Sequence, residues 1–383
     1  MDPEKKSASI FKKFSLENIF IGVAILLGVI LIINVILASG ISNELKKSTE
    51  AVKEKLKPAK IELVLVKNSK SSDCFDISTI VSHVKNANVN ITKEAMFEFD
   101  SREGKALIGK YKIEKIPAII LTGEIEKVSI EDLEKRQDAL LLVQPEPPYT
   151  DAATGKIEGK VALYILKDTA CGKCNDLSLL ISQIKNAGIR ISDEKIVAPE
   201  SGEGKVLISK YNIGFVPSLI LSKDAAAYSI MQQAWQQIGS RENDGSYVLR
   251  VVSPPFINLT TAKLRGLVDI TYLTDKTCTE CYNVSQHRLI LANPQGFAMK
   301  LEKEETYDIS DAKGKELIAK YSITKIPTVI LSNEIDAYPS SLPLKQFFSV
   351  EKDGSYVFRK MEVVGTYKDL AANQVVIPQQ IEQ

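Results

Sequence analysis

One sequence pattern recurs three times along the chain, and it constrains the fold more than any other feature. It reads G-K-x-L-I-x-K-Y-x-I-x-x-[IV]-P, and its copies end at Pro117, Pro217 and Pro327. Successive prolines lie 217 − 117 = 100 and 327 − 217 = 110 positions apart, a period the size of a domain rather than of a solenoid repeat. The chain therefore contains three copies of one folding unit, which we call repeats 1, 2 and 3.

Other segments repeat in step with this pattern and place the boundaries. DGSYVLR from Asp244 returns as DGSYVFR from Asp353, and PPYTDAATGKIEGKV from Pro147 matches PPFINLTTAKLRGLV from Pro254. Pro-Pro steps with Thr and Gly neighbours are typical of connections between folded units. We predict repeats at 59–146, 147–253 and 254–365. The flanking segments are an N-terminal tail at 1–18, a transmembrane anchor at 19–40, a helical stalk at 41–58 and a C-terminal tail at 366–383.

The same order of elements is predicted in each repeat. It begins with an apolar, β-prone run such as VALYIL from Val161, followed by a polar loop that holds the cysteine position. An amphipathic helix comes next, and in repeat 2 Leu177, Leu180, Ile181 and Ile184 fall on one of its faces. A second strand, a short helix, the proline and a strongly apolar strand such as SLILS follow. This order predicts an α/β fold with a central mixed sheet and flanking helices, in three tandem copies.

The composition leaves cysteine as the residue that carries the chemistry. A count of 49 Lys+Arg against 48 Asp+Glu gives a net charge of +1, which argues against nucleic acid as a partner. With 2 His, the chain has little capacity for histidine zinc sites or histidine general bases. Of the 5 cysteines, Cys171 and Cys174 form one Cys-x-x-Cys pair, Cys278 and Cys281 form another, and Cys74 stands alone.

The placement of both pairs resembles the thioredoxin superfamily, in which a Cys-x-x-Cys lies between a first strand and a helix and a proline opens a core strand further on. Here Cys171 precedes Pro217 by 217 − 171 = 46 positions, and Cys278 precedes Pro327 by 327 − 278 = 49. The resemblance covers nearly everything after residue 60. The overall plan is also similar to tandem protein disulfide oxidoreductases. It implies three tandem thioredoxin-like units, with redox-active disulfides in repeats 2 and 3.

The chain departs from that family near both motifs. Ala170 and Thr277 stand where the family commonly has a tryptophan, and Ile165 and Tyr272 lie near the position of its buried acid. These differences concern the rate and direction of electron transfer more than the fold.

Position within the motif assigns the cysteine roles. At a helix N-terminus, unpaired N–H groups and the helix dipole stabilise an anion, which lowers the pKa of a thiol placed there. We therefore expect Cys171 and Cys278 to be the attacking thiolates and Cys174 and Cys281 to be the resolving thiols. The intervening residues differ in charge, and a lysine at position 173 favours the thiolate while a glutamate at position 280 opposes it. The Cys171 site is expected to be the more oxidising one.

The resemblance also implies that the repeat prolines are cis and that the backbone before them pairs with substrate. It assigns four residues to this substrate-binding platform, namely Val216, Pro217, Ile326 and Pro327. Asp168 and Asp275, each three residues before a motif, are predicted to be turn acids rather than proton shuttles. In repeat 1 the aligned segment is SSDC, with Ser71 at the attacking position and Cys74 at the resolving one. A serine hydroxyl cannot replace a thiolate, so repeat 1 is predicted to be redox-inactive.

The uncharged run IFIGVAILLGVILIINVILA at 19–38 is about 20 residues long and predicts a membrane-spanning helix. Since long domains are translocated largely regardless of charge and exported compartments favour disulfides, we expect a single-pass membrane protein. Its N-terminus would be cytoplasmic, and its thioredoxin-like units extracytoplasmic.

The sequence thus predicts a membrane-anchored thiol-disulfide oxidoreductase without a cofactor or metal. Its partners would be protein thiols and disulfides and a redox partner, either a reductase or a membrane oxidase. Two alternatives stay open. One is a non-catalytic thioredoxin-like binding scaffold, and the other is a zinc centre that uses all four paired cysteines.

Overall fold

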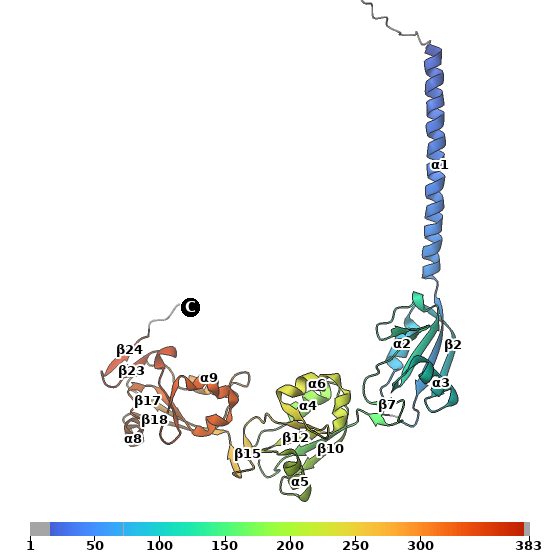
Figure 1. The fold of residues 1–383 in the computed structure, drawn as a ribbon. Helices are drawn as coiled ribbons and strands as arrows, with labels where there is room; N and C mark the ends of the chain where they lie inside the picture. The colour runs from blue at the N-terminus through green and yellow to red at the C-terminus, as the bar shows by residue number, and fades with distance from the viewer. Residues whose placement is uncertain (1–15, 72, 379–383) are drawn as a thin grey trace, which may run out of the picture. The chain divides into compact units, whose positions relative to one another are not determined.

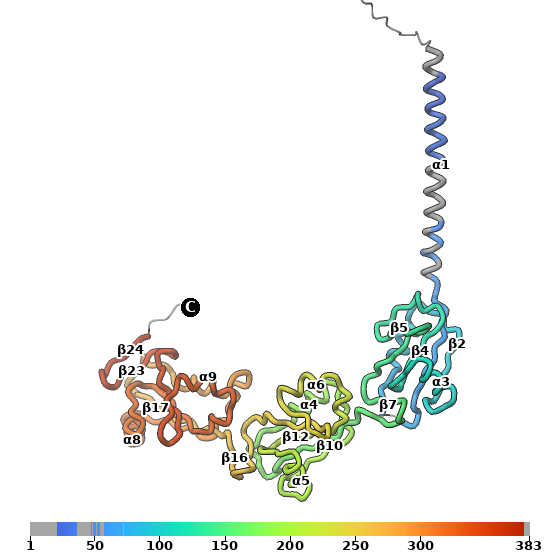
Figure 2. The backbone as a smooth tube through the Cα atoms, in the orientation of Figure 1, coloured from blue at the N-terminus to red at the C-terminus, as the bar shows by residue number. Residues whose placement is uncertain are grey.

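The computed structural model describes residues 16–71 and 73–378 of the chain (Figures 1 and 2). The predicted tail at 1–18 lies mostly outside these residues, as does the end of the predicted tail at 366–383. The chain divides into two compact parts, one built around repeat 1 and one that contains repeats 2 and 3.

The apolar run and the predicted stalk form one helix, α1 (Leu16–Leu56). Crossing a bilayer takes about 20 consecutive apolar residues in one helix. No helix within the described ranges is both long enough and apolar enough to do so. The predicted transmembrane anchor at 19–40 is therefore not confirmed, and the single-pass localisation that was derived from it is contradicted.

Each repeat contains a mixed sheet, as the sequence predicted, and each of the three sheets has five strands in the same order. The outermost strand at one edge runs parallel to its neighbour, and the other pairings are antiparallel. In sheet order the strands of repeat 1 are β2 (Val89–Glu98), β1 (Ala59–Lys67), β4 (Ala118–Gly123), β6 (Ala139–Leu141) and β5 (Glu134–Arg136). Those of repeat 2 are β10 (Ile191–Val197), β9 (Val161–Leu166), β12 (Ser218–Leu221), β14 (Tyr247–Leu249) and β13 (Gly239–Arg241). Those of repeat 3 are β18 (Lys300–Asp308), β17 (Leu267–Thr274), β20 (Thr328–Leu331), β22 (Tyr356–Phe358) and β21 (Phe348–Val350).

Helices cover the sheets. In repeat 1 they are α2 (Ser78–Asn86), α3 (Arg102–Tyr111) and the 3-10 turn η1 (Ile125–Lys127). In repeat 2 they are α4 (Ser178–Asn186), α5 (Gly202–Tyr211), η2 (Lys223–Ala227), α6 (Ser229–Ala234) and η3 (Trp235–Gln237). In repeat 3 they are α7 (Gln286–Ala292), α8 (Ala312–Tyr321), η4 (Asn333–Ala337), η5 (Pro339–Ser341), α9 (Leu342–Lys345) and η6 (Met361–Val363).

Strand β9 of repeat 2, which lies next to the central strand of its sheet, contributes to a core cluster on each face. In repeat 2, Leu163 shares one core cluster with Ile181 of α4, while Leu166 shares a second cluster with Tyr211 of α5. Burial on both faces explains why β9 is a nearly continuous apolar run rather than an alternating one.

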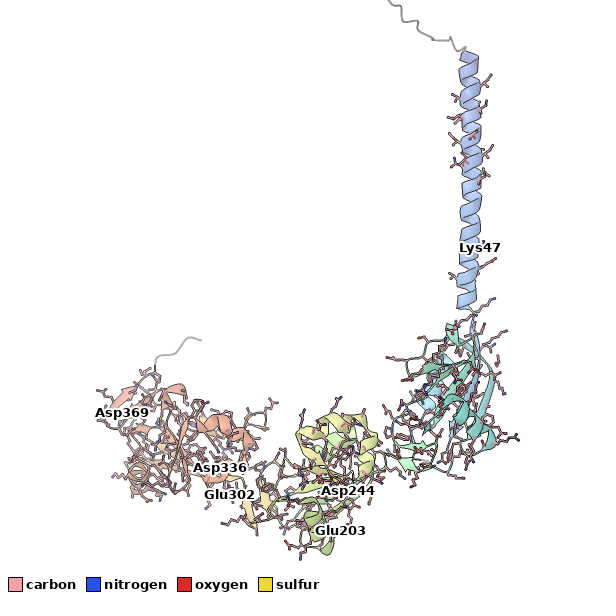
Figure 3. All side chains as sticks on the ribbon, in the orientation of Figure 1. Lys47, Glu203, Asp244, Glu302, Asp336 and Asp369 are labelled. Atoms are coloured by element: carbon pink, nitrogen blue, oxygen red, sulfur yellow. A yellow bond between two sulfur atoms is a disulfide. The ribbon has the colours of Figure 1, made fainter. Side chains whose placement is uncertain are left out.

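Short strands and hairpins complete the architecture. The two-residue strands before the repeat prolines are β3 (Lys115–Ile116), β11 (Phe215–Val216) and β19 (Lys325–Ile326). The hairpins are β7 (Tyr149–Asp151) with β8 (Ile157–Glu158), β15 (Phe256–Asn258) with β16 (Lys263–Arg265), and β23 (Tyr367–Asp369) with β24 (Gln374–Val376). The last hairpin lies in the range for which the sequence predicted a tail, and Figure 3 labels its Asp369. The carboxylate of Asp369 accepts from the N–H groups of Ala371 and Ala372 and closes the hairpin turn.

Two contacts explain the repeated sequence pattern. Its glycine lies in the first turn of a helix, next to the end of the preceding strand, and a Cβ on Gly204 would collide with the carbonyl oxygen of Ala198. Its tyrosine binds the aspartate of the later DGSY segment. The Tyr211 hydroxyl donates to Asp244 (labelled in Figure 3) at 2.9 Å, and the lysine before the tyrosine pairs with the same carboxylate. Repeat 3 makes the corresponding contacts with Asp353.

Candidate redox site

Both Cys-x-x-Cys motifs contain a closed disulfide. The Sγ atoms of Cys171 and Cys174 are 2.07 Å apart and those of Cys278 and Cys281 are 2.00 Å apart, with 5.5 Å between the Cα atoms in each pair. All four residues are partly exposed. Because each sulfur is bonded within its own motif, none is a thiolate that could bind a shared zinc ion in this state. In the described part of the chain, no group of three or more His, Cys, Asp or Glu side chains is arranged for a metal ion.

The motifs lie in turns before the helices, not in their first turns. Helix α4 begins at Ser178, which is 178 − 171 = 7 positions after Cys171, and α7 begins at Gln286, which is 286 − 278 = 8 positions after Cys278. The effect of the helix dipole falls off within the first turn. The structure therefore does not place the motif in the first turn of the helix, as the expectation for the attacking cysteine assumed.

An Asx turn lies directly before the start of each of these helices. The Asp176 carboxylate accepts from the N–H group of Ser178 at 3.0 Å and from its hydroxyl at 2.8 Å. Asn283 makes the same two contacts with Ser285 in repeat 3. Such Asx turns satisfy N–H groups at a helix start, so they fix the helix beginning after the motif rather than within it.

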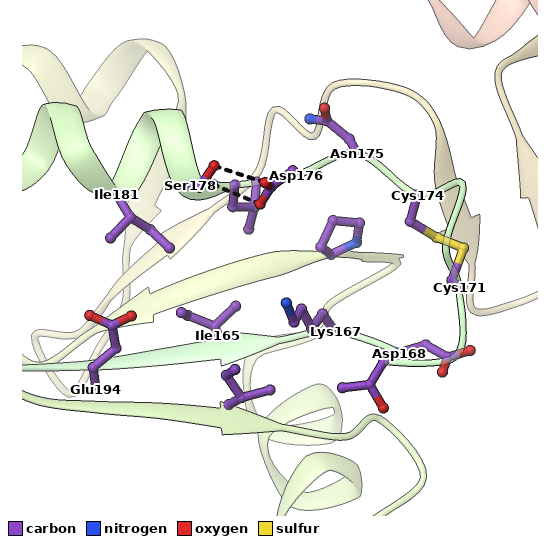
Figure 4. Close-up of a pocket in the computed structure, with 14 residues that line it drawn as sticks. Ile165, Lys167, Asp168, Cys171, Cys174, Asn175, Asp176, Ser178, Ile181 and Glu194 are labelled. Atoms are coloured by element: carbon purple, nitrogen blue, oxygen red, sulfur yellow. Dashed lines mark hydrogen bonds between the residues drawn. A yellow bond between two sulfur atoms is a disulfide. The ribbon is translucent and has the colours of Figure 1, made fainter.

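In repeat 2 the disulfide borders an open hollow (Figure 4). Ile165 and Lys167 line it from β9 and the residue after it, Glu194 from β10, and Ile181 from α4. Two of the charged residues that line the hollow, Lys167 and Glu194, lie on either side of Ile165 in Figure 4.

The predicted platform residues lie beside the disulfides, and their strands are already paired. The peptide bonds before Pro217 and Pro327 are cis. Pro217 lines the same hollow as the repeat 2 disulfide, and the carbonyl oxygen of Ile326 lies 4.0 Å from Sγ of Cys281. Strand β11, which ends at Val216, pairs with β15, and β19, which ends at Ile326, pairs with β23. Each pairing comes from a hairpin of the chain itself.

Both acids before the motifs act as turn acids. The carboxylate of Asp168 accepts from Ala170 N–H at 2.8 Å, and that of Asp275 accepts from Thr277 N–H at 2.8 Å. Asp275 has an additional partner, because Lys368 of β23 forms an ion pair with it at 2.7 Å. The side chain of Asp275 is only 3% exposed and that of Lys368 is 18% exposed. Burial raises the pKa of Asp275, but the hydrogen bonds from Lys368 and Thr277 outweigh it and hold the pKa below its usual value.

Lys368→Met is expected to destabilise repeat 3 by about 2 kcal/mol, because it leaves a buried carboxylate without its cation. The pKa of Asp275 is depressed in the folded state, so the contribution of the pair is present at neutral pH and is lost as the pH falls through the folded pKa. Urea unfolding at neutral pH measures the loss. The double variant Lys368→Met/Asp275→Asn is the control and should recover most of it. Equal stability of wild type and Lys368→Met would contradict the prediction.

A partly buried tyrosine and a buried histidine adjoin the repeat 3 motif. The hydroxyl of Tyr282, the residue after Cys281, donates to the carbonyl oxygen of Pro327 at 3.0 Å and lies 3.2 Å from Nε2 of His287. That hydroxyl has one proton and the carbonyl can only accept, so Nε2 of His287 carries a proton and donates to the hydroxyl. Burial raises the pKa of Tyr282 and lowers that of His287 to about 4.

The sequence reasoning missed this pair, although comparing the repeats shows it. His287 stands where repeats 1 and 2 have the apolar residues Ile80 and Leu180. Tyr282 stands where repeat 2 has Asn175. A histidine at a position that is apolar in the other copies was the available signal.

His287 should make repeat 3 sensitive to acid. Its folded pKa is depressed, so between about pH 6.5 and about pH 4 the unfolded chain binds a proton that the folded chain does not, and stability falls as the pH falls. The expected loss across that window is about 3 kcal/mol. We expect His287→Leu, which copies Leu180, to flatten the dependence. Urea unfolding at several pH values measures both proteins, and parallel pH profiles would refute the prediction.

Repeat 1 has one cysteine at the resolving position. Sγ of Cys74 lies 3.3 Å from Oγ1 of Thr150, whose side chain is fully buried. Thr150 of β7, Ile257 of β15 and Lys368 of β23 occupy the same position in their hairpins. The hairpin residue at this position therefore lies near the motif in repeats 1 and 3. Its side chain is a hydroxyl in the first hairpin, apolar in the second and charged in the third.

No protein-family model matches the chain. No curated protein matches it either.

Several solved structures share limited similarity with the chain. The alkylhydroperoxide reductase AhpF from Enterococcus faecalis is 15% identical, over 47% of this chain and 88% of that one, with a TM-score of 0.15. Human ERp44 in its form II is 14% identical, over 78% and 85% respectively, with a TM-score of 0.15. A protein disulfide oxidoreductase from Aeropyrum pernix is 15% identical, over 46% and 81%, with a TM-score of 0.14. TM-scores this low carry no argument about this chain.

Proposed function

We propose that the chain is a thiol-disulfide oxidoreductase that works through the disulfides of repeats 2 and 3. The observation that carries the proposal is the pair of partly exposed disulfides, each closed within a Cys-x-x-Cys turn beside the short strand that precedes a repeat proline. A thiolate can attack a sulfur in such a position without a change in the backbone.

The exchange proceeds in two steps that balance. A substrate thiolate attacks Sγ of Cys278, which forms a mixed disulfide, breaks the bond to Cys281 and leaves a Cys281 thiolate that takes up a proton. A second substrate thiol then displaces Cys278, so two thiols become one disulfide while the protein gains two electrons and two protons. Cys171 and Cys174 take the same roles in repeat 2. In the reverse direction Cys171 and Cys278 are the attacking thiolates, as the sequence suggested. Repeat 1, with Ser71, takes no part.

The experiment is catalysed exchange between dithiothreitol and oxidised glutathione, followed by the appearance of reduced glutathione. The rate should rise in proportion to the concentration of the full chain. A chain that binds partners without catalysis, the scaffold alternative, would leave the uncatalysed rate unchanged. Redox titration of each site tests the further prediction that the Cys171 site is the more oxidising one. Equal potentials, or a higher potential at the Cys278 site, would contradict it.

A further inference from the structure

The short strands β11 and β19 are the natural place for an extended peptide to pair next to each disulfide. The carbonyl oxygen of Ile326 in β19 lies 4.0 Å from Sγ of Cys281. The residue after β11, Pro217, lines the hollow beside the repeat 2 disulfide. A free strand edge at this place would let a polypeptide add itself as a further strand while its cysteine reached the disulfide.

Hairpins of the chain fill both edges. Val216 of β11 lies opposite Ile257 of β15, and Ile326 of β19 lies opposite Lys368 of β23. The N–H group of Leu259 donates to Gly214 at 2.9 Å, and that of Leu370 donates to Thr324 at 2.8 Å. Hydrogen-bonded pairs alternate along an antiparallel ladder, so the residue before each proline falls in the next hydrogen-bonded position. The backbone groups that a substrate strand would need are therefore already used.

The hairpins are also fixed to the motif loops. The N–H group of Asn175, the residue after Cys174, donates to the carbonyl oxygen of Pro255 at 2.7 Å. In repeat 3 the N–H group of Tyr282, the residue after Cys281, donates to the carbonyl oxygen of Thr366 at 2.8 Å. Each of these carbonyls lies directly before its hairpin, so each hairpin is bound both to the edge strand and to the loop that carries the disulfide.

Buried contacts attach each hairpin to the repeat that precedes it in the chain. Phe256 of β15 is 8% exposed, and its ring lies 4.7 Å from that of Phe215 in β11. Tyr367 of β23 belongs to the main core cluster of repeat 3. Next to it, the buried ion pair of Lys368 with Asp275 joins β23 to the turn before Cys278. Displacing β23 would expose a core residue and separate this ion pair.

The cysteines remain partly exposed to solvent although the edges of β11 and β19 are paired. The residues inside the motifs, Gly172 and Lys173 in repeat 2 and Thr279 and Glu280 in repeat 3, are all exposed, and the cysteines are partly exposed. A thiol can therefore reach the disulfide from the side of the motif. It cannot at the same time place its backbone against β11 or β19.

We propose that the two disulfides exchange with low-molecular-weight thiols, which reach Sγ without pairing as a strand. This rests on the proposed function and names the substrate class of the same sites. In one turnover, two such thiols become one disulfide, and the protein disulfide becomes two thiols with two electrons and two protons gained.

The test compares three thiols in single turnover with the oxidised full chain. They are glutathione, an unstructured peptide with one cysteine, and the same peptide with N-methyl groups on the residues flanking the cysteine. N-methylation removes the N–H groups that strand pairing needs, while the thiol stays the same. Each site is followed separately by mass spectrometry after an acid quench, using Cys278→Ser/Cys281→Ser to observe repeat 2 and Cys171→Ser/Cys174→Ser to observe repeat 3.

The expected result is that both peptides react within about twofold of each other and glutathione is not slower than either. Strand pairing at either site would instead slow the methylated peptide by about tenfold or more, because backbone hydrogen bonds would be lost. That outcome would overturn the inference and leave the proposed function standing. If none of the three thiols reduced either disulfide, the proposed function would fail, and the inference with it.

Discussion

A full-length chain that carries Cys171→Ser together with Cys278→Ser is expected to show no thiol-disulfide exchange above the uncatalysed background. The remaining thiols, Cys174 and Cys281, could still form mixed disulfides with glutathione, but neither site could close the internal disulfide that the proposed exchange regenerates in each cycle. Turnover in the exchange between dithiothreitol and oxidised glutathione should fall by at least about a hundredfold. The change places serine where repeat 1 already has Ser71.

The single variants separate the two sites. Cys171→Ser should retain the rate of the repeat 3 site, and Cys278→Ser should retain that of repeat 2. Cys74→Ser is the matched control, because it removes a thiol outside both motifs and keeps a group that can bond to Thr150. Its rate should equal that of the wild type. Appreciable turnover in the double variant, or a loss in Cys74→Ser, would contradict the assignment.

Gly204→Ala is expected to destabilise repeat 2 by about 4–5 kcal/mol, near the upper end of single-residue effects. A Cβ at this position would collide with the backbone oxygen of Ala198 and would also lie 2.8 Å from that of Pro199. Both atoms belong to the turn that joins β10 to α5, so relief would require the helix to move away from the sheet. The measurement is urea unfolding of the full chain, followed by the fluorescence of Trp235, which lies in the core of this repeat.

Gly109→Ala is the matched control for this clash. Gly109 lies inside α3, nothing lies within 4 Å of where its Cβ would be, and repeat 3 has Ala319 at the same position. Alanine lowers the entropy of the unfolded chain, so this variant should gain about 0.5–1 kcal/mol. A small effect of Gly204→Ala, similar in size to that of Gly109→Ala, would show that α5 can move without cost.

The three repeats made the fold predictable from the sequence. A position-by-position comparison of the repeats would also have identified His287 as an exception. Three prolines in register implied three α/β units, and the three sheets confirm this. The sequence placed the motif at the N-terminus of a helix because the apolar spacing of Leu177, Ile181 and Ile184 was clear, whereas the Asx turn of Asp176 was overlooked. His287 was passed over because each repeat was considered mainly for its cysteines and prolines.

The last hairpin and the membrane segment were not predicted correctly from the sequence, for different physical reasons. Strands of three residues such as β23 (Tyr367–Asp369) contain too few residues to show an alternating pattern, so this range was assigned to a tail. Pairing with β19 determines this strand, and β19 lies far away in the sequence. The anchor was inferred from an uncharged run of about 20 residues, and no helix among the described residues meets the length and apolarity that a span needs.

The β15–β16 hairpin has a consequence for the order in which the chain folds. It closes the edge of β11 in repeat 2, but its residues follow that repeat and lead directly into β17. A chain made from its N-terminus cannot close this edge until Arg265 has left the ribosome. In the interval, Cys171 and Cys174 lie beside an unpaired strand of the kind that captures other extended chains. Translation between Val216 and Arg265 is thus the period in which repeat 2 is most open to mispairing.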